Sequence, residues 1–536
     1  MNDIPHMAEL APTSAAARTV KATPLRTGAE YIASLKEDGR AVFVDGERVK
    51  DVTTHPAFRG AVASVAKLYD LAADPAQRER MTFVSPTTGG PVMRCFQIPR
   101  TAADLAAKRR FSETWAHNTL GLMGRSPDHV ANFFAGYAAK PSIFARGGEQ
   151  YARNVVSFYE QMRDTHRYVS YTIVPPQIDR SKPAHKQSDP TLYAGVVEER
   201  DDGIVLSGAQ QLGTGAILSD MIQISCIQPL QPGDENYAFN VVVAANAPGV
   251  KLYSRRAYAA HATNSFDYPL TTRFDETDAL LVLDRVFVPW EHVFVYRNLE
   301  VCRDQWWKTP AHVYGNHQAQ TRYAVKLKFM MGLAQRMNEM TGNAGNPQVN
   351  VQMGALAAHV QTVESMLHAQ EAMSSFDDEG VLWPSVATLY AVMALQAEHY
   401  PRMIDMVREL AGGSLIMQPS SAADFDNPEI AADLARYVHS ASATAPERVA
   451  LMRMAWDFIG SEFAGRHQQY EKFYGGASFL VKQNMLRNYD MAGATALVDS
   501  ALALPAFCSN NPSCAGMHRA GYDRGAVPPG KTCGRC

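Results

Sequence analysis

Residues 280–297, LLVLDRVFVPWEHVFVYR, mark the point at which the character of this chain changes. The stretch begins with the β-branched alternation of a strand, and Pro289 then interrupts it, because proline has no N–H to donate to a sheet. His292 follows the interruption directly and has aromatic neighbours in the sequence. A histidine at such a junction is a candidate proton-transfer group, although a lone histidine of this kind is more often a satisfied boundary residue.

Three kinds of pattern follow one another along the chain. Helical spacing dominates residues 25–165, interrupted by a hairpin signal at Asp45-Gly46. Over residues 166–300 the period changes to two, and clusters of Gly, Pro, Asp and Asn separate short strands, as in a small antiparallel barrel or sandwich. Long amphipathic helices return over residues 301–505. This order predicts an α+β fold with an N-terminal mainly helical domain, a central antiparallel β-domain and a C-terminal helical bundle.

The two ends of the chain differ from the rest. Residues 1–24 have the composition of a disordered leader, without the basic start and apolar stretch of a signal peptide. Residues 506–536 carry four of the seven cysteines, with His518 between two pairs. Four thiolates could hold zinc, but the loose spacing equally suits a disordered extension, so both interpretations stay open. The four are Cys508, Cys514, Cys533 and Cys536.

Composition excludes several partners. Of the 536 residues, 46% are hydrophobic and 20% are charged, as in a soluble globular protein with a large core. The net charge of -3 gives no electrostatic reason to expect nucleic acid or an anionic membrane as a partner. No apolar run reaches the length of a membrane span, so we expect a cytoplasmic protein.

Several familiar signatures are missing. The sequence has no G-x-G-x-x-G after a strand, no G-x-x-x-x-G-K-[ST], no H-E-x-x-H and no G-x-S-x-G. These absences argue against a dinucleotide-binding sheet, a P-loop, a zincin and an α/β-hydrolase.

Four polar clusters remain, and the first is GRSPDH at residues 124–129. Arg125 offers a rigid fork of donors that suits an anionic oxygen, such as a phenolate or a flavin carbonyl. His129 could bond the same ligand. The alternative is a plain helix start, with Ser126 or Asp128 as the N-cap and Arg125 in solvent.

The other three clusters lie in the β-region and near the end of a long helix. Residues 170–180, SYTIVPPQIDR, end in a loop that two prolines make rigid, and rigid loops can aim groups at a ligand. Residues 207–216 contain Gly213 and Gly215, which would let a planar ring approach the backbone. Residues 460–467, GSEFAGRH, end in an Arg-His pair suited to a pyrophosphate. A tight strand exit, a β-bulge and a helix C-cap are the alternatives that need no ligand.

Taken together, these motifs resemble those of the 4-hydroxyphenylacetate 3-hydroxylase family, the oxygenase components of two-component flavin-dependent phenol monooxygenases. The resemblance covers residues 26–504. It rests on R-T-G-A-E-Y-I-x-S-L, V-K-D-V-T-T-H-P-A-F-R, M-G-R-S-P-D, I-V-P-P-Q-I-D-R, S-G-A-Q-Q-L-G-T-G, F-D-E-T-D-A, F-V-P-W-E-H-V and G-S-E-F-A-G-R-H.

The resemblance implies an acyl-CoA dehydrogenase-like fold with a C-terminal four-helix bundle, usually as a homotetramer, with a dimer as the alternative. It also implies that FAD arrives reduced, as FADH2, from a separate NAD(P)H-flavin reductase. Molecular oxygen would be the co-substrate and a small phenol the substrate. Delivery by diffusion would explain why no nicotinamide site is visible in the sequence.

The same resemblance assigns roles to residues. Arg125 and His292 are expected to be catalytic, Arg125 by holding the phenol oxygen or the oxygenated flavin and His292 as the base that forms the phenolate. No metal ligand is expected. Substrate contacts are expected from Arg125, His129, Tyr171, Thr214 and Gln228. Flavin contacts are expected from Tyr171, Thr172, Ile173, Gln177, Ile178, Asp179, Arg180, Thr214, Ala464, Gly465, Arg466 and His467.

Three positions depart from the hydroxyphenylacetate branch of the family. That branch has tyrosine at the position of His129, histidine at that of Tyr171 and asparagine at that of His292. We therefore expect a simple, chloro- or nitro-substituted phenol in place of 4-hydroxyphenylacetate. Hydroxylation ortho to the phenol oxygen would give a catechol, and attack at the para carbon could release halide or nitrite.

Two other functions would fit the same fold. An iron–sulfur flavin dehydratase resembling 4-hydroxybutyryl-CoA dehydratase needs three cysteines and a histidine. His292 and Cys302 could contribute, but the segment around Arg125 has no cysteine pair. A non-enzymatic flavin-binding protein is the second alternative, and it predicts no oxygen consumption with reduced flavin.

Overall fold

The computed structural model describes residues 22–502. The expected leader up to residue 21 and the cysteine-containing tail therefore lie outside the described residues. The described chain forms one compact unit up to Met485 and a second unit from Leu486 onwards. Every residue of the site described below belongs to the first unit.

The N-terminal part is mainly helical, as predicted. The hydroxyl of Thr27 accepts the N–H of Glu30 while the Glu30 carboxylate accepts the N–H of Thr27, so the first helix has a capping box. The predicted hairpin turns at Asp45-Gly46, and both residues have the positive φ that such a turn needs. The elements are α1 (Gly28–Leu35), β1 (Ala41–Val44), β2 (Glu47–Val49), α2 (Arg59–Ala73), α3 (Arg78–Met81), β3 (Thr82–Val84), β4 (Pro91–Met93), α4 (Ala102–Asn118), α5 (Pro127–Ala139), α6 (Ser142–Ala145) and α7 (Glu149–Thr165).

The β-region contains two sheets, of orders β2-β1-β10-β11-β7-β6 and β12-β9-β8-β5. Most strand pairs are antiparallel, as predicted, and two are not, because β1 pairs with β10 and β5 pairs with β8 in parallel. The N-terminal hairpin joins the larger sheet because its Val42 and Val44 are buried in the core. The further elements are β5 (Val169–Thr172), β6 (Gly195–Arg200), β7 (Gly203–Gln210), β8 (Met221–Ser225), β9 (Phe239–Ala244), β10 (Val250–Ser254), α8 (Thr271–Phe274), β11 (Ala279–Pro289) and β12 (Val293–Tyr296).

Residues 280–297 pass from one sheet to the other. Strand β11 ends at Pro289, whose partner on β7 is Gly203, where the missing proline N–H interrupts the ladder. A single turn of 3₁₀ helix follows at Trp290–His292, and the chain then enters the smaller sheet as its edge strand β12. The helical pattern therefore begins one strand later than the sequence suggested.

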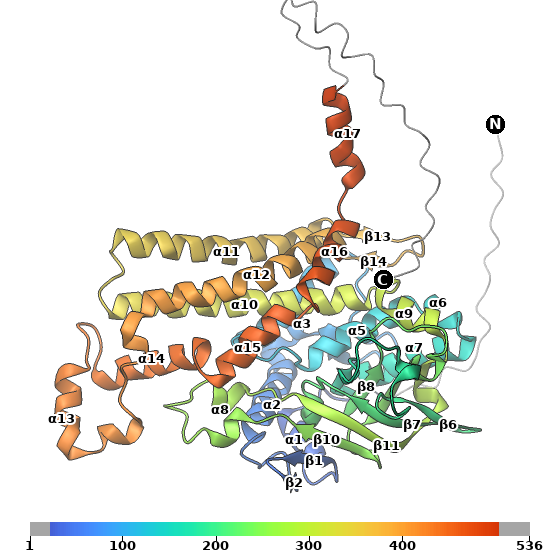
Figure 1. The fold of residues 1–536 in the computed structure, drawn as a ribbon, viewed down its shortest axis with the longest axis horizontal. Helices are drawn as coiled ribbons and strands as arrows, with labels where there is room; N and C mark the ends of the chain where they lie inside the picture. Colours follow the sequence, from blue (N-terminus) through green and yellow to red (C-terminus); the bar gives the residue numbers. More distant parts are fainter. Residues whose placement is uncertain (1–21, 503–536) are drawn as a thin grey trace, which may run out of the picture. The chain divides into compact units, whose positions relative to one another are not determined.

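Long helices make up the C-terminal part, as predicted, and Figure 1 shows α10, α11 and α12 lying side by side. Helices α14 and α15 continue the bundle, and α12 packs against α15. The elements are α9 (Leu299–Trp307), α10 (Ala311–Met340), α11 (Pro347–Ala372), β13 (Ser375–Phe376), β14 (Leu382–Trp383), α12 (Val386–Ala411), α13 (Pro428–Tyr437), α14 (Ala445–Ile459), α15 (Glu462–Phe473), α16 (Ser478–Arg487) and α17 (Met491–Leu502).

Helix α5 joins the three parts of the first unit. It packs against α10 of the bundle, α7 of the N-terminal part and β5 of the smaller sheet. Two glycines allow the close approach to α10: a Cβ on Gly136 would lie 2.3 Å from the backbone of Ala311, and one on Gly315 would lie 2.0 Å from the Phe133 ring. The start of α5 therefore faces residues from the sheet and from the bundle at once.

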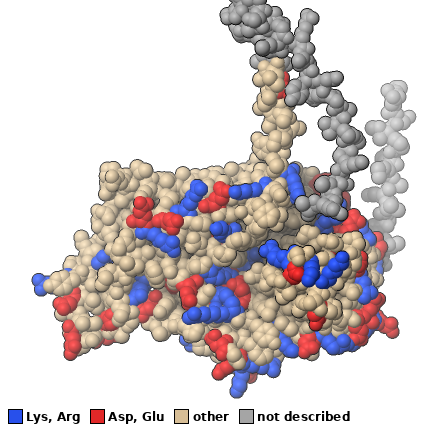
Figure 2. Space-filling model, viewed as in Figure 1, with Lys and Arg blue, Asp and Glu red and all other residues tan. Residues whose placement is uncertain are grey.

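Charges of both signs lie on the face of the molecule that Figure 2 shows. On the face drawn in Figure 2, basic and acidic side chains are interspersed over the first unit, in keeping with the net charge of -3. Within residues 22–502, no helix is both long and apolar enough to span a membrane.

Candidate active site

The backbone just before α5 is fixed by two buried side chains. The carboxylate of Glu276 accepts the N–H groups of Gly124 (3.0 Å) and Arg125 (2.6 Å). The hydroxyl of Tyr168 donates to the carbonyl oxygen of Arg125 (2.6 Å). Burial raises the pKa of Glu276, and Arg466 and the amide donors oppose that rise. The position of Arg125 is therefore set by residues from the β-region.

The Arg125 side chain points into a group of tyrosine rings. Its guanidinium carbon lies 5.2 Å from the ring centre of Tyr171, 5.4 Å from that of Tyr470 and 4.8 Å from that of Tyr474. Nη1 donates to the Tyr470 hydroxyl (2.8 Å). Aromatic faces stabilise a cation without neutralising its charge. The alternative of a solvated Arg125 is therefore wrong.

Gly124 is required where α15 approaches this segment. A Cβ at this position would lie 2.2 Å from the hydroxyl oxygen of Tyr470. The glycine of the M-G-R-S-P-D motif thus lets Tyr470 reach Arg125, and it links that motif to α15.

His129, on the first turn of α5, completes the cluster. It is fully buried, and its Nδ1 lies 2.9 Å from Oε1 of Gln318 on α10. Its ring centre is 5.6 Å from that of Tyr171 and 6.5 Å from that of Tyr474. Burial, and next the charge of Arg125, lower the pKa of His129 well below its usual range, so the imidazole is neutral at pH 7. Its Nε2 makes no hydrogen bond within the described chain.

Two of the predicted flavin residues, Thr214 and Arg466, meet on one carboxylate that the sequence did not single out. Asp278 accepts two hydrogen bonds from Arg466 (3.0 and 2.7 Å) and one from the Thr214 hydroxyl (2.5 Å). Arg255 adds a further bond (3.0 Å). Burial would raise the pKa of Asp278, but these cations hold it well below its usual range. Arg466 also lies 3.8 Å from Glu276, which connects this group to the Arg125 segment.

His467 belongs to a buried charged network in the bundle. Its Nδ1 lies 3.1 Å from Nζ of Lys326, which donates to Glu471 (2.9 Å), and Glu471 also accepts from Arg322. Burial lowers the pKa of Lys326 to about 8, and burial with the surrounding cations lowers that of His467 well below its usual range. The network links the middle and the last turn of α15 to α10.

Buried polar atoms near these groups fit a flavin cofactor. Nη1 of Arg466, Nε2 of His467 and Oγ1 of Thr172 are all buried, and none has a hydrogen-bond partner in the described chain. Gly213 keeps space beside Thr172, since its Cβ would lie 3.3 Å from Cγ2 of Thr172. Buried polar atoms normally have partners, so this set of a guanidinium, an imidazole and a hydroxyl suits a ligand with phosphate or ring oxygens.

The remaining predicted flavin and substrate residues are not drawn into this cluster. Ile173 is buried in the core, but Gln177, Ile178 and Arg180 are exposed. Asp179 caps its own loop by accepting from Ser181 and pairing with Lys182. Gln228 lies in the loop after β8, where its carbonyl accepts from Cys226. Their expected roles stay predictions.

Ala464 and Gly465 occupy the first turn of α15, and Ala464 donates its N–H to the N-cap Ser461. The G-S-E-F-A-G-R-H segment therefore ends one helix, with Gly460 as the C-cap of α14, and begins the next, with Ser461 as the N-cap of α15.

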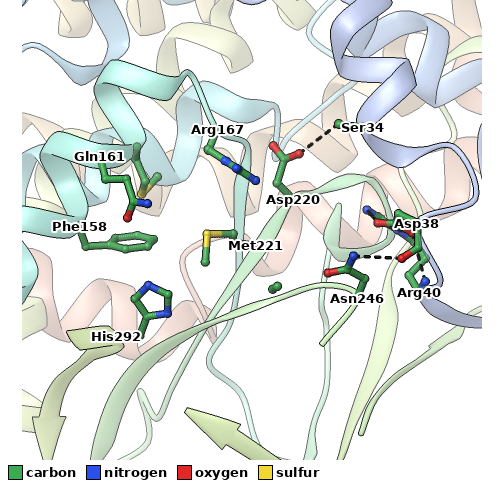
Figure 3. A pocket seen from close by; sticks show the side chains of 12 residues that line it. Ser34, Asp38, Arg40, Phe158, Gln161, Arg167, Asp220, Met221, Asn246 and His292 are labelled. Carbon is green, nitrogen blue, oxygen red and sulfur yellow. Dashed lines mark hydrogen bonds and ion pairs between the residues drawn. The ribbon is translucent and has the colours of Figure 1, made fainter. Parts of the chain in front are cut away.

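His292 lies apart from Arg125. It directly precedes β12, which is one edge of the smaller sheet, whereas Tyr171 lies on β5, the opposite edge. The His292 ring packs against Phe158 (5.6 Å between ring centres) and lines a cavity of about 200 Å³. Figure 3 shows the two rings next to each other, with Met221 beside them and Arg167 and Asp220 farther along the cavity. Its role as a base stays a prediction.

Sequence reasoning missed Tyr470, Tyr474 and Gln318, and it did not single out Glu276 and Asp278 within the F-D-E-T-D-A motif. The tyrosines had a signal, because Arg466, Tyr470 and Tyr474 are spaced four apart and so share one helix face. No sequence signal marked Gln318, since nothing in its own segment reveals that α10 places it against His129.

The iron–sulfur alternative finds no support. Among residues 22–502, no group of three His, Cys, Asp or Glu side chains could hold a metal ion. The described cysteines are free and buried, and Arg125 and His129 occupy the segment where a cysteine pair would be needed.

Comparison with known proteins agrees with the motifs. A solved structure titled the oxygenase component (HpaB) of 4-hydroxyphenylacetate 3-monooxygenase complexed with FAD has a TM-score of 0.84 at 33% identity, covering 89% of this chain and 98% of that one. A 4-hydroxybutyryl-CoA dehydratase from N. maritimus has a TM-score of 0.82 at 21% identity, covering 90% and 96%, which shows a shared fold alone. The predicted α+β fold is confirmed.

Curated relatives carry the same description. The 4-hydroxyphenylacetate 3-monooxygenase oxygenase component of Pseudomonas aeruginosa is 36% identical over 477 residues, 87% of this chain and 90% of that protein. The 4-nitrophenol 2-monooxygenase, oxygenase component, of a Rhodococcus species is 34% identical over 475 residues, 87% and 89%. Models described as 4-hydroxyphenylacetate 3-hydroxylase N terminal and C terminal match residues 27–295 and 302–503. The chain therefore belongs to the 4-hydroxyphenylacetate 3-hydroxylase family of FAD-dependent aromatic monooxygenases, as its motifs predicted.

Proposed function

We propose that this chain hydroxylates a small phenol at the carbon ortho to the hydroxyl, using molecular oxygen and FADH2 supplied by a separate NAD(P)H-flavin reductase. The observation that carries the proposal is the half-buried Arg125 guanidinium. Within residues 22–502 it forms no ion pair with a carboxylate, and tyrosine rings surround it. Such a cation is stabilised by a ligand that brings an anionic oxygen, and a phenolate is that ligand with an aromatic ring attached.

Three guanidiniums lie around the Tyr470 ring, and only one of them suits the substrate. Arg322 pairs with Glu471, and Arg466 pairs with Asp278. Arg125 alone among the three has no carboxylate partner in the described chain. A second anionic group on the substrate, such as the carboxylate of 4-hydroxyphenylacetate, would therefore meet cations whose charge is already balanced. This supports a simple, chloro- or nitro-substituted phenol.

The surroundings of Arg125 already accommodate a phenol ring. The side chain of Tyr474 is itself a phenol, and it packs on the guanidinium within reach of His129 and Tyr171. The position suits a planar ring held by cation–π and edge-on aromatic contacts.

FAD would be held by Arg466, His467, Thr172 and the Gly213 segment, where buried polar atoms have no partner in the described chain. When bound in its reduced form, FAD supplies the electrons that activate oxygen. The chain's own residues orient the phenol through Arg125, stabilise negative charge on its oxygen and keep bulk water away through the tyrosine rings. Negative charge on the phenol oxygen makes the ortho carbon a better nucleophile, which is why the proposed site centres on a cation.

Product analysis tests the proposal. Purified protein, FADH2 from any reductase, oxygen and one phenol at a time would be mixed, with phenol, 4-nitrophenol, 4-chlorophenol and 4-hydroxyphenylacetate as the panel. A catechol or quinone from one of the first three is expected. Turnover of 4-hydroxyphenylacetate alone would contradict the substrate assignment, and peroxide alone from every phenol would contradict phenol hydroxylation. Oxygen consumption no different from that of FADH2 without the protein, with no hydroxylated product, would support a non-enzymatic flavin-binding protein.

A further inference from the structure

We propose that His129 is the residue that takes the proton from the phenol, and that Gln318 and Asp128 hold its ring in the tautomer that makes this possible. The inference rests on the proposed function and deepens it. It concerns four buried side chains that are linked by hydrogen bonds at the start of α5 and on α10. They are Ser126, Asp128, Gln318 and His129.

In this series of four side chains, the donor and the acceptor of each hydrogen bond are fixed. The Ser126 hydroxyl donates to Oδ1 of Asp128 (2.6 Å), and the Gln318 amide donates to Oδ2 (3.1 Å). Burial raises the pKa of Asp128, and the hydrogen bonds from Ser126, Ser112 and Gln318 oppose that rise. As a carboxylate, Asp128 accepts and cannot donate, so the Gln318 NH₂ faces it. Oε1 of Gln318 then faces Nδ1 of His129 at 2.9 Å. An amide oxygen also cannot donate, so the proton of the neutral imidazole must sit on Nδ1.

Nε2 of His129 is therefore unprotonated, and its lone pair can accept a proton. This atom is buried and makes no hydrogen bond within the described chain, and the ring that carries it lies between Tyr171 and Tyr474, the same rings that surround Arg125. A buried nitrogen that can only accept, beside a cation without a carboxylate partner, is the arrangement needed to receive a phenol O–H.

The proton step balances within the site. The O–H bond of the phenol breaks and an N–H bond forms at Nε2 of His129, while the electron pair stays on the phenol oxygen and faces Arg125. The charge of the phenolate is then shared between the guanidinium and the new imidazolium. No further reactant is required for this step.

Charged and titratable groups face His129 from every element that packs on it. They are Arg125 before α5, Asp128 on α5, Tyr171 on β5, Tyr474 after α15, and Arg322 on α10. The two arginines disfavour an imidazolium in the absence of an anion. His129 is therefore neutral and ready to accept before the phenol binds, and it gains a stabilising partner only as the phenolate forms.

Asp128→Asn is the sharpest test, because it exchanges one oxygen for nitrogen. The asparagine can still accept from Ser126 through Oδ1, and it then presents an NH₂ to Gln318. The Gln318 amide must turn its oxygen to that NH₂ and its own NH₂ to Nδ1 of His129. The proton of the imidazole moves to Nε2, which can then no longer accept. Reversal of a tautomer in this way removes base function while the geometry stays intact.

The readout is the pH dependence of kcat/KM for hydroxylation of phenol and of the more acidic 4-nitrophenol, with FADH2 and oxygen. For the wild type, kcat/KM with phenol should change little between pH 7 and pH 9. His129→Gln should lose about 10²-fold with phenol at pH 7 and Asp128→Asn at least about tenfold. Both losses should shrink as the pH rises, because phenol ionises in solution and needs no base. With 4-nitrophenol, which ionises more readily, both losses should be several-fold smaller.

Two further variants complete the design. Gln318→Leu removes the acceptor of the Nδ1 proton and should show the same pattern with a smaller loss; it carries the test if Asp128→Asn does not fold. His117→Gln, at an exposed histidine of α4, is the matched control and should behave as the wild type. Thermal unfolding verifies that each variant is folded.

Losses that are equal for the two phenols at every pH, or no loss in His129→Gln, would overturn the assignment of His129 as the proton acceptor. A wild type that forms no catechol from any phenol would instead overturn the proposed function, so the two failures are distinguishable.

Discussion

Two regions of the molecule each place a buried or half-buried histidine against aromatic rings, and they differ in what else is present. Around His129 the rings also enclose a guanidinium without a carboxylate partner, and a glutamine fixes the imidazole. Around His292 the main neighbour is Phe158, in a cavity of about 200 Å³ whose Asp220 is already paired with Arg26. We therefore favour His129 as the base, and the expectation that His292 is the base remains the alternative that the variants below test. A nearby charge that stabilises the deprotonated substrate makes the difference.

Removal of the Arg125 charge should lower the rate of hydroxylation more than any other change proposed here. Arg125→Met keeps a long apolar side chain under the tyrosine rings but loses the cation, so the rate of 4-nitrophenol hydroxylation should fall about 10²- to 10³-fold. Oxidation of FADH2 to give peroxide should continue, because the flavin residues are untouched. Catechol yield and peroxide yield in the same reaction measure the two outcomes. Hydroxylation within threefold of the wild type would show that the phenol binds elsewhere.

A smaller effect is expected where the Arg125 region meets the flavin residues. Asp278→Asn weakens the two-bond contact that orients Arg466, so the dissociation constant of FADH2 should rise about tenfold. Anaerobic titration with reduced FAD measures it. Asp284→Asn, at an exposed carboxylate of β11 that pairs with Lys251, is the matched control. Equal affinity in the two variants would remove Asp278 from the flavin site.

The smallest effect is expected at the second histidine. His292→Gln should change the rate of hydroxylation less than about threefold, with phenol and with 4-nitrophenol alike. The reason is that the His292 ring packs on Phe158, in a cavity that Arg125 and its tyrosines do not line. Burial lowers the pKa of His292, so it is neutral at pH 7 and its replacement removes no charge. A loss that is several-fold larger for phenol than for 4-nitrophenol would restore His292 as the base and contradict the assignment of His129.

Local patterns predicted most of the fold. Period-two and helical spacings depend on neighbours a few residues apart, so the order of helical part, β-region and bundle was predictable. The pairing of β1 with β10 was not, because it joins residues about two hundred positions apart. The same limit applies to residues 280–297, where the strand and its interruption were predictable but the change of sheet was not.

The site was predictable in part for the same reason. Arg125, His129 and Tyr171 lie together as their motifs suggested, and Arg466 and Thr214 meet on one carboxylate. The contacts that give these residues their chemistry come from distant segments. Nη1 of Arg125 reaches Tyr470 on α15, and Nδ1 of His129 reaches Gln318 on α10. No spacing within the first segment encodes such contacts.

The most direct measurement is a crystal structure of the protein with FAD and 4-nitrophenol bound. We predict that the phenol oxygen lies about 3 Å from the Arg125 guanidinium and from Nε2 of His129, with the ring among Tyr171, Tyr470 and Tyr474. A phenol bound instead in the cavity between His292 and Phe158, with Arg125 still packed on its tyrosines, would contradict the account.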